Sequence, residues 1–259
     1  MPSWTPSQIS TDLWLDCNDV STIYSSDVGG TLVADGGSVG RLEDKSGNAR
    51  HAVESNASLR PVRSGTSIVF TADRLRIPVS AFGLGRMLIG VFNSSTTRSN
   101  ASAGFININS SPNDNPELRF GNFVSPSDGG GVAAYWNSGY AILGYYNAID
   151  SAVWAQSFVA GITTTLWKNG TQQATGTRSG TWSTINEFTL GYYTRISHSR
   201  NGTLRELIVC DPSNRQIVEG YLSWKWGLQS SLPASHPYKD FAPRYGDQQR
   251  RRYSGAYGL

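Results

Sequence analysis

Apolar and polar residues alternate in short stretches along much of this chain. The stretch 104–109 shows the pattern clearly, because Ile106 and Ile108 alternate with Asn107 and Asn109, which is the period of a strand with one buried face. Other apolar stretches are separated by glycine and polar turn residues. They predict further strands near residues 13–16, 67–70, 75–77, 87–92, 118–123, 141–147, 152–161, 163–167, 172–177, 187–193 and 203–210.

Turn residues divide these stretches in two different ways. Between two of them lies Lys168-Asn169-Gly170-Thr171, and Asn-Gly is favoured in two-residue hairpin turns because both positions need a positive φ. Residues 25–50, by contrast, are rich in Gly, Ser, Asp and Asn. This composition predicts a long structured loop.

One helix is expected near residues 212–226. Asp211 is a favourable N-cap, Pro212 suits the first helical position, and Gly227 lies where a helix often ends in the left-handed conformation. The apolar positions between these signals follow a helical period, so we expect one face to pack on the rest of the protein. They are Ile217, Tyr221, Trp224 and Leu228, with Val218 and Leu222 beside them.

Many short strands and a single helix predict an all-β, antiparallel sandwich or barrel. No internal repeat is visible, and no linker precedes the prolines that follow residue 232. We therefore expect one domain, residues 1–238, which includes the helix and is followed by an extended C-terminal arm, residues 239–259.

Composition and charge refine this picture. Hydrophobic residues make up 38% of the chain and charged residues 16%, and 28 glycines suit many tight turns. The net charge of +3 resides in residues 239–259, which hold five basic and two acidic residues, so residues 1–238 are neutral overall. A neutral body argues against nucleic acid as a partner.

The ends and the cysteines bear on the compartment. The first residues lack the basic and apolar regions of a signal peptide, and no apolar run approaches the ~20 residues of a membrane helix. We therefore expect folding in a cytosol and no membrane insertion. Cys17 and Cys210 fit either two buried thiols or one bridge between terminal strands, and buried thiols are commoner in a cytosol.

Several pairs of segments resemble a known family. They are Ser157–Gly161 with Thr165–Thr171, Phe188–Gly191 with Gly202–Val209, Leu13–Asp16 with Asp44–Asn48, and Glu219–Leu228 with Leu232-Pro233 and His236-Pro237-Tyr238. These segments resemble concanavalin A-like, laminin-G-like jelly rolls, in the version found in structural proteins of tailed bacteriophages. The resemblance covers residues 10–240.

The resemblance implies a jelly-roll sandwich on a virion surface, as a capsid decoration or in a tail appendage, assembled in the cytoplasm of the bacterial host. Its partners would be capsid or tail subunits and further copies of the chain in a homo-oligomer. A lectin-like domain of this kind could also bind a host surface glycan.

Residues typical of an enzyme are sparse. Glycosidases need paired carboxylates that share one face, and no strand here carries such a pattern. The densest acidic groups, at residues 12–19 and 43–44, lie among turn residues and suit caps. His51, His198 and His236 have no zinc-binding spacing. We therefore predict a protein that is not an enzyme and that needs no cofactor.

Two kinds of ligand are candidates, calcium and carbohydrate. Many laminin-G-like domains bind calcium, and Asp73, Asp114 and Asp128 are the candidate ligands, although none has a fixed oxygen-ligand spacing around it.

Carbohydrate is the second ligand. Aromatic rings suit sugars, and five of them lie in a Gly-, Ser- and Asn-rich stretch; the alternative is that these rings fill the core or a subunit interface. They are Tyr135, Trp136, Tyr140, Tyr145 and Tyr146.

The C-terminal arm combines positive charge, aromatic residues and glycine without periodicity, so it cannot form a core of its own. It is either a solvated end or an arm that docks on a neighbouring subunit, with arginines on carboxylates and tyrosines in shallow pockets. We favour the docking arm. Its candidate contact residues are Arg244, Tyr245, Arg250, Arg251, Arg252, Tyr253 and Tyr257.

The sequence thus supports three hypotheses, in decreasing order. The first is a non-enzymatic structural protein of a phage virion, anchored by its arm. The second is a carbohydrate-binding receptor-recognition module of a tail fibre. The third is a glycan hydrolase.

Overall fold

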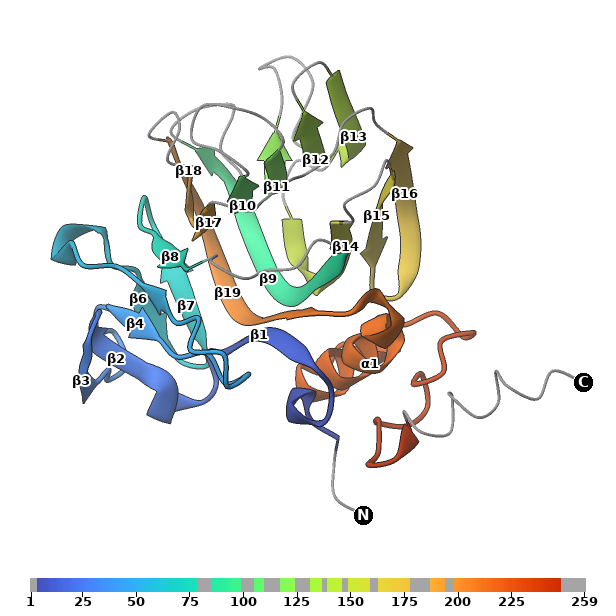
Figure 1. The fold of residues 1–259 in the computed structure, drawn as a ribbon, viewed down its shortest axis with the longest axis horizontal. Coiled ribbons are helices and arrows are strands. Elements are labelled where there is room, and N and C mark those ends of the chain that lie inside the picture. Colours follow the sequence, from blue (N-terminus) through green and yellow to red (C-terminus); the bar gives the residue numbers. More distant parts are fainter. Residues whose placement is uncertain are drawn as a thin grey trace, which may run out of the picture.

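The protein is described by a computed structural model in which two antiparallel sheets face each other (Figure 1). The described residues are 4–78, 85–98, 105–109, 117–123, 131–136, 139–145, 149–158, 163–177, 187–193 and 198–247. Among them, no helix has the length and apolar character needed to cross a membrane.

The first sheet has nine strands in the order β16-β15-β14-β9-β19-β7-β6, and β1 and β18 also pair with β19. Its strands are β1 (Thr11–Asp16), β6 (Val62–Ser64), β7 (Ser67–Phe70), β9 (Arg86–Arg98), β14 (Ile149–Phe158), β15 (Thr163–Lys168), β16 (Thr171–Thr177), β18 (Tyr192–Tyr193) and β19 (His198–Cys210).

The second sheet has ten strands in the order β13-β12-β11-β10-β17-β8-β5-β4-β2-β3. They are β2 (Ile23–Ser26), β3 (Gly29–Leu32), β4 (Arg41–Leu42), β5 (Ala52–Val53), β8 (Leu75–Ile77), β10 (Ile106–Asn109), β11 (Glu117–Phe123), β12 (Gly131–Trp136), β13 (Gly139–Tyr145) and β17 (Glu187–Leu190).

The main core lies between the two sheets. Phe70, Phe92 and Trp154 enter it from the nine-stranded sheet, and Ile106 and Phe188 enter it from the ten-stranded sheet; all are buried. Burial of one such side chain stabilises the fold by about 1.5–3 kcal/mol relative to exposure.

A second apolar cluster lies on the other face of the nine-stranded sheet, beneath the helix α1 (Arg215–Lys225). Ile89 and Val91 of β9 point toward α1, whereas Leu88 and Phe92 point into the main core. The residues 87–92 are therefore continuously apolar because both faces of β9 are buried. The helix is preceded by η5 (Pro212–Asn214), and the other short 3-10 helices are η1 (Pro6–Gln8), η2 (Val20–Thr22), η3 (Ala57–Leu59) and η6 (Gln229–Ser231).

The structure confirms the predicted fold class, with two antiparallel sheets and one C-terminal helix. The Asn169-Gly170 turn between β15 and β16 has φ of 48° and 78°, as the hairpin requires. At the helix, the Asp211 side chain accepts a hydrogen bond from the Ser213 N–H, and Gly227 has a φ of 69°. Ile217, Val218 and Leu222 form the buried apolar part of the helix, so the buried face is centred nearer 218–222 than the sequence pattern predicts.

One expectation needs correction, and the two alternatives for the cysteines are decided in favour of buried thiols. Residues 25–50 contain the second half of β2 together with β3 and β4, and the glycine-rich sequence hid them because Gly29 and Gly30 extend the hairpin with φ of 106° and 100°. Cys17 and Cys210 are both buried and free. No bridge is feasible, because Cys210 pairs with Thr11 at one end of the β1–β19 ladder and Cys17 lies beyond its other end.

Candidate functional site

The outward face of the ten-stranded sheet is fixed by its register. Ile106 and Ile108 of β10 point into the core, so Asn107 between them belongs to the outward face. Residues paired across an antiparallel ladder share a face. The strand pairs therefore assign each paired position of this sheet to one side or the other.

Three of the predicted sugar-binding positions share this outward face. Arg119 pairs with Asn107 on one side and with Ala133 on the other, which places Tyr135, two residues along, on the outward face. Tyr135 pairs directly with Tyr140. Tyr145 joins them because it pairs with Gly131 beyond a one-residue bulge in β13.

The remaining two positions differ. Trp136 pairs with Gly139 and occupies the face opposite to Tyr135, because neighbouring strand positions alternate. Tyr146 lies outside the described residues. By this alternation Trp136 occupies a core-face position, whereas Tyr135 and Tyr140 occupy outward-face positions.

The same outward face continues across the N-terminal strands as one row of paired residues. Thr189 pairs with Arg76, Arg76 with Val53, and Val53 with Arg41. Arg41 then pairs with Tyr24, which pairs with Leu32 at the sheet edge. We call these residues the arginine row: Arg76, Val53, Arg41, Tyr24 and Leu32.

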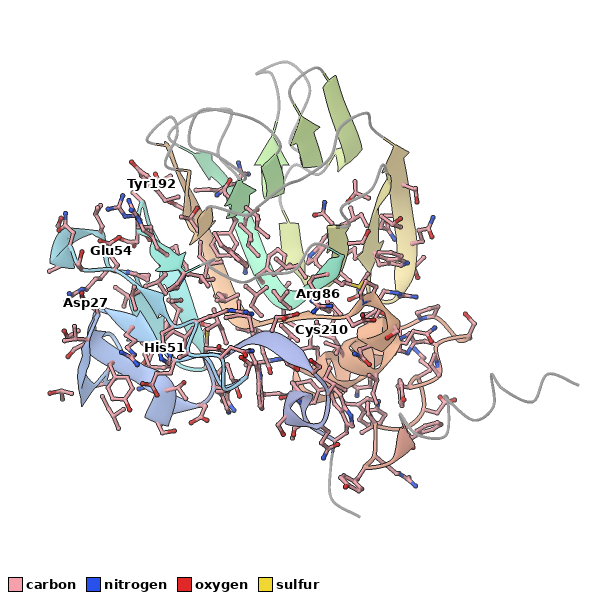
Figure 2. All side chains as sticks on the ribbon, viewed as in Figure 1. Asp27, His51, Glu54, Arg86, Tyr192 and Cys210 are labelled. Atoms are coloured by element: carbon pink, nitrogen blue, oxygen red, sulfur yellow. The ribbon has the colours of Figure 1, made fainter. Side chains whose placement is uncertain are left out.

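Tyr192 of β18 separates the two halves of the face. Its carbonyl oxygen accepts hydrogen bonds from Asn107 Nδ2 (3.0 Å) and Thr189 Oγ1 (2.6 Å), and both of these side chains are buried. The guanidinium of Arg74 lies 5.1 Å from the centre of the Tyr192 ring, which is a favourable cation–π geometry. Figure 2 shows Tyr192 and Glu54 on the side of the molecule formed by β2–β8.

The arginines in and beside the arginine row differ in whether a carboxylate is paired with them. Arg41 Nη2 lies 3.0 Å from Glu43 Oε1, and Arg74 is paired with the buried Glu54. Burial lowers the pKa of the nearby His51, and the positive charge of Arg41 lowers it further. Arg76 is exposed, and no ion pair holds it within the described residues.

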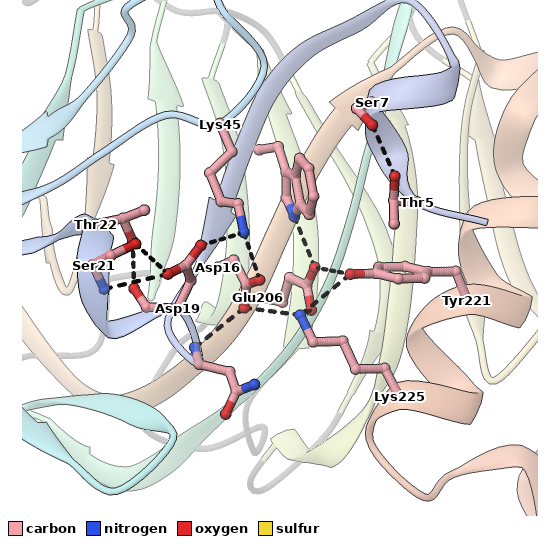
Figure 3. A network of polar contacts seen from close by, with 12 residues as sticks. Thr5, Ser7, Asp16, Asp19, Ser21, Thr22, Lys45, Glu206, Tyr221 and Lys225 are labelled. Atoms are coloured by element: carbon pink, nitrogen blue, oxygen red, sulfur yellow. Dashed lines mark hydrogen bonds and ion pairs between the residues drawn. The ribbon is translucent and has the colours of Figure 1, made fainter. Parts of the chain in front are cut away.

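A buried ion cluster forms a separate polar feature where β1, β19 and α1 meet (Figure 3). Asp16 and Glu206 are paired opposite each other on β1 and β19. Lys225 Nζ lies 2.8 Å from Asp16 Oδ1 and 2.7 Å from Glu206 Oε2. Lys45 Nζ contacts Asp16 Oδ2 at 3.2 Å and Asp19 Oδ2 at 2.6 Å.

Glu206 is fully buried and receives further donors. Trp14 Nε1 and Tyr221 Oη donate to Oε1 at 2.8 Å and 3.0 Å, and Trp226 Nε1 donates to Oε2 at 2.8 Å. Burial raises the pKa of Glu206, and the Asp16 carboxylate raises it further, whereas Lys225 acts in the opposite direction. Such a saturated, enclosed carboxylate fastens the helix to the sheet and offers no lone pair to a substrate.

The sequence did not reveal this carboxylate pair, because its two members are far apart along the chain. One signal was present: Asp16 ends the apolar run Leu13-Trp14-Leu15, and Glu206 directly precedes the apolar run Leu207-Ile208-Val209. Leu13–Asp16 and Asp44–Asn48 are among the segments that carry the family resemblance, and these two segments contact each other. Asp44 Oδ1 accepts the Trp14 N–H at 2.9 Å, and the Lys45 N–H bonds to the Trp14 carbonyl at 2.8 Å.

The structure places one calcium candidate. Asp73 Oδ2 accepts the backbone N–H of Thr71 at 2.7 Å, and burial raises the pKa of this carboxyl. Asp114 and Asp128 lie outside the described residues. Within the described part of the chain, no three His, Cys, Asp or Glu side chains gather in a metal-binding arrangement.

The first part of the predicted arm contacts the body. Pro243 accepts the Trp4 N–H at 3.3 Å, and the Phe241 ring packs edge-on against Tyr238 with centroids 6.0 Å apart. Arg244 and Tyr245 are exposed. A cavity of 190 Å³ opens beside them, lined by Pro237, Tyr238, Phe241 and Asp247.

The other arm candidates lie beyond the described residues: Arg250, Arg251, Arg252, Tyr253 and Tyr257. The predicted boundary between domain and arm at residue 239 therefore stays a prediction.

Comparison with known proteins adds evidence on the fold. Neither a protein-family model nor a curated protein matches the chain. Among solved structures, a GH54 α-L-arabinofuranosidase soaked with 4-nitrophenyl α-L-arabinofuranoside matches 79% of this chain and 56% of its own, with 13% identity and a TM-score of 0.50.

Two further structures match with lower TM-scores. Domain 4 of a GH43 arabinanase from Geobacillus stearothermophilus, in complex with arabinotriose, has a TM-score of 0.49 at 13% identity, and the match covers 64% of this chain and 85% of that one. A Trypanosoma rangeli sialidase has a TM-score of 0.46 at 12% identity, and the match covers 77% of this chain and 30% of that one.

These matches correct one prediction. The chain was expected not to be an enzyme, but the solved structure that matches it with a TM-score of 0.50 is a GH54 α-L-arabinofuranosidase. The exclusion of enzymes is therefore wrong, because this type of fold occurs in them. At 13% identity the match shows the fold alone, a β-sandwich.

Proposed function

We propose that the protein binds carbohydrate on the outward face of its ten-stranded sheet. The observation that carries this proposal is the direct pairing of Tyr135 with Tyr140, with Tyr145 on the same face. Paired positions on neighbouring strands have Cβ atoms about 5 Å apart. Adjacent aromatic residues on a sheet face provide a flat apolar surface for a sugar ring, and polar residues beside them fix its orientation.

Two further facts support a sugar as the ligand. The same face carries Glu117 beside Tyr135 and Arg119 beside Asn107, so hydrogen-bonding residue types surround the tyrosines. In addition, the arabinofuranosidase that shares the fold was studied with an arabinofuranoside. A carbohydrate is therefore a reasonable class of ligand for this fold and this face together.

We also propose that this sheet is displayed on a phage virion, with residues 248–259 as the part that docks on capsid or tail subunits. The support is the resemblance of the opening, hairpin and closing segments to phage structural jelly rolls, together with the charge of the arm. On this view the neutral body faces outward toward a host glycan, and the arginine-rich end joins the particle.

Glycan-array binding followed by calorimetric titration tests the proposed function. We expect Tyr140→Ala to abolish binding to the glycans that the array identifies, because it removes one half of the paired tyrosines. Tyr245→Ala is the matched control, because this tyrosine is 67% exposed at the other end of the molecule. Trp136→Ala should mainly reduce stability, since its position belongs to the core face.

Four outcomes are informative. Loss of binding in Tyr140→Ala alone supports the proposal. Equal binding by Tyr140→Ala and the parent protein would contradict it, and so would a subunit interface that buries these tyrosines. Release of sugar from a bound glycan would assign hydrolysis in addition to binding.

A further inference from the structure

We propose that the arginine row binds a carboxylated polysaccharide, with Arg76 and Arg41 as its carboxylate-binding residues. This inference rests on the proposed function and names the chemical class of glycan that the face prefers. It concerns the half of the face formed by β2, β4, β5 and β8, beyond Tyr192 and away from the tyrosines of β12 and β13.

The two arginines are held at a defined spacing. Val53 pairs with Arg41 on one side and with Arg76 on the other, so the two arginines lie two strands apart on one face. Neighbouring strands are about 4.8 Å apart, which places the two backbones about 10 Å apart. Backbone hydrogen bonds between the strands fix this distance, so no side-chain contact is needed to maintain it.

The two guanidinium groups differ in their availability. Arg76 is exposed between the buried Leu75 and Ile77, and the described residues offer it no carboxylate. Arg41 has one carboxylate contact, to Glu43, and its side chain is 20% exposed. An arginine can bind a carboxylate through two parallel hydrogen bonds, and Arg76 retains this full capacity.

Arg74, which directly precedes β8, shows by contrast an arginine with a structural role. Its guanidinium is paired with Glu54 and covered by the Tyr192 ring. Arg41 and Arg74 each have a glutamate partner, Glu43 and Glu54. The positive charge of Arg76 is left without such a partner among the described residues.

The neighbouring apolar residues favour a sugar chain over other anions. Tyr24 is half-buried beside Arg41, Val53 lies between the arginines, and Leu32 is 50% exposed at the edge. A nucleic acid presents closely spaced phosphates and needs many basic residues, whereas this face has one free arginine and one partly engaged arginine. Sparse carboxylates on a chain of sugar rings match this arrangement better.

Titration with polygalacturonate and with neutral arabinan at low salt tests the inference. We expect Arg76→Ala to weaken binding of polygalacturonate about tenfold, since a hydrogen-bonded charged pair contributes on that scale, and to leave binding of the neutral glycan unchanged. Arg76→Lys should fall between the two, because it keeps the charge and loses the two-pronged contact. Arg41→Ala should have a smaller effect. Arg244→Ala, another exposed arginine, is the matched control.

Some results would overturn the inference. Equal affinity of the parent protein for the two polymers would do so, as would an Arg76→Ala variant that binds polygalacturonate normally. If dextran sulfate, a polyanion with sulfates and no carboxylates, bound as tightly as polygalacturonate, the attraction would be for charge alone and the carboxylate preference would be refuted. In each case Tyr140-dependent binding of a neutral glycan would leave the proposed function standing, whereas absence of all glycan binding would refute both.

Discussion

Asp16 and Glu206 face each other across the β1–β19 ladder, and the ammonium group of Lys225 contacts both carboxylates. Three segments from distant parts of the sequence are joined at this point: the first strand, the last strand and the helix (Figure 3). The nine-stranded sheet thus lies between α1 and the ten-stranded sheet. The outward face of the ten-stranded sheet is on the side away from these contacts.

Replacement of Lys225 by Met should destabilise the protein by about 3 kcal/mol, because it leaves two buried carboxylates without their shared cation. The free energy of unfolding from denaturant titration checks this prediction. Lys45→Met is the graded control and should cost less, since one of its partners, Asp19, has a side chain that is 31% exposed.

The same variant should show an altered pH dependence. Without the ammonium group, which acts against the effect of burial, the pKa of Glu206 in the folded state rises further above the unfolded value. A raised pKa favours the folded state at low pH, and this advantage is lost as the pH rises through the folded pKa. The difference in unfolding free energy between Lys225→Met and the parent protein should therefore become smaller as the pH falls toward 4.5, the ordinary pKa of glutamic acid. A deficit that stays constant between pH 7 and pH 4.5 would contradict this explanation.

Gly220 allows α1 to approach Tyr238 closely. A Cβ at this position would lie 2.6 Å from the Tyr238 Cβ. Gly220→Ala should destabilise the protein by about 1–2 kcal/mol, because overpacking outweighs the gain of about 1 kcal/mol in helix propensity. Thermal unfolding measures the change, and a stabilised variant would show that the helix can shift away from Tyr238 at no cost.

Asp211 caps the turn that leads into the helix, and the hydrogen bonds from Ser213 lower the pKa of its carboxyl. Asp211→Ala should cost about 1 kcal/mol at pH 7. A lowered pKa means that this contribution is present above 3.8 and is lost as the pH falls through the folded value. Asp211→Asn keeps an uncharged cap, so its stability should lack this pH-dependent component; chemical denaturation of both variants from pH 7 to pH 3 separates the two effects.

Truncation can divide the predicted arm into two parts. Deletion of residues 248–259 keeps every described contact, whereas deletion of residues 240–259 removes the Pro243–Trp4 hydrogen bond and the Phe241–Tyr238 packing. We expect the longer deletion to lower the melting temperature more than the shorter one, because it also removes these two contacts. If the proposed docking is correct, both deletions should prevent incorporation into particles, and normal incorporation of the shorter deletion would count against it.

The sequence predicts the strands of this fold well where the apolar pattern is regular. Residues 67–70 and 75–77 were predicted with the bounds that the structure shows, because alternation and flanking turn residues mark both ends. The strands Arg41–Leu42 and Ala52–Val53 were missed, since two residues carry no periodicity.

The candidate site was only partly predictable. Composition identified Tyr135 and Tyr140, but only the register shows that they are direct partners on the outward face and that Trp136 is not. The arginine row could not be predicted, because Arg41 and Arg76 come together only through the pairing of β4, β5 and β8. Such pairing over long sequence distances depends on the whole sheet and leaves no local signal.

Hydrogen–deuterium exchange in the presence of a glycan identified by the array tests the central claim most directly. If the glycan occupies the outward face of the ten-stranded sheet, amide exchange should slow in β10–β13 and in the strands of the arginine row, and it should not change in α1. Protection confined to α1 or to the cavity beside Phe241, with β10–β13 unaffected, would contradict the account.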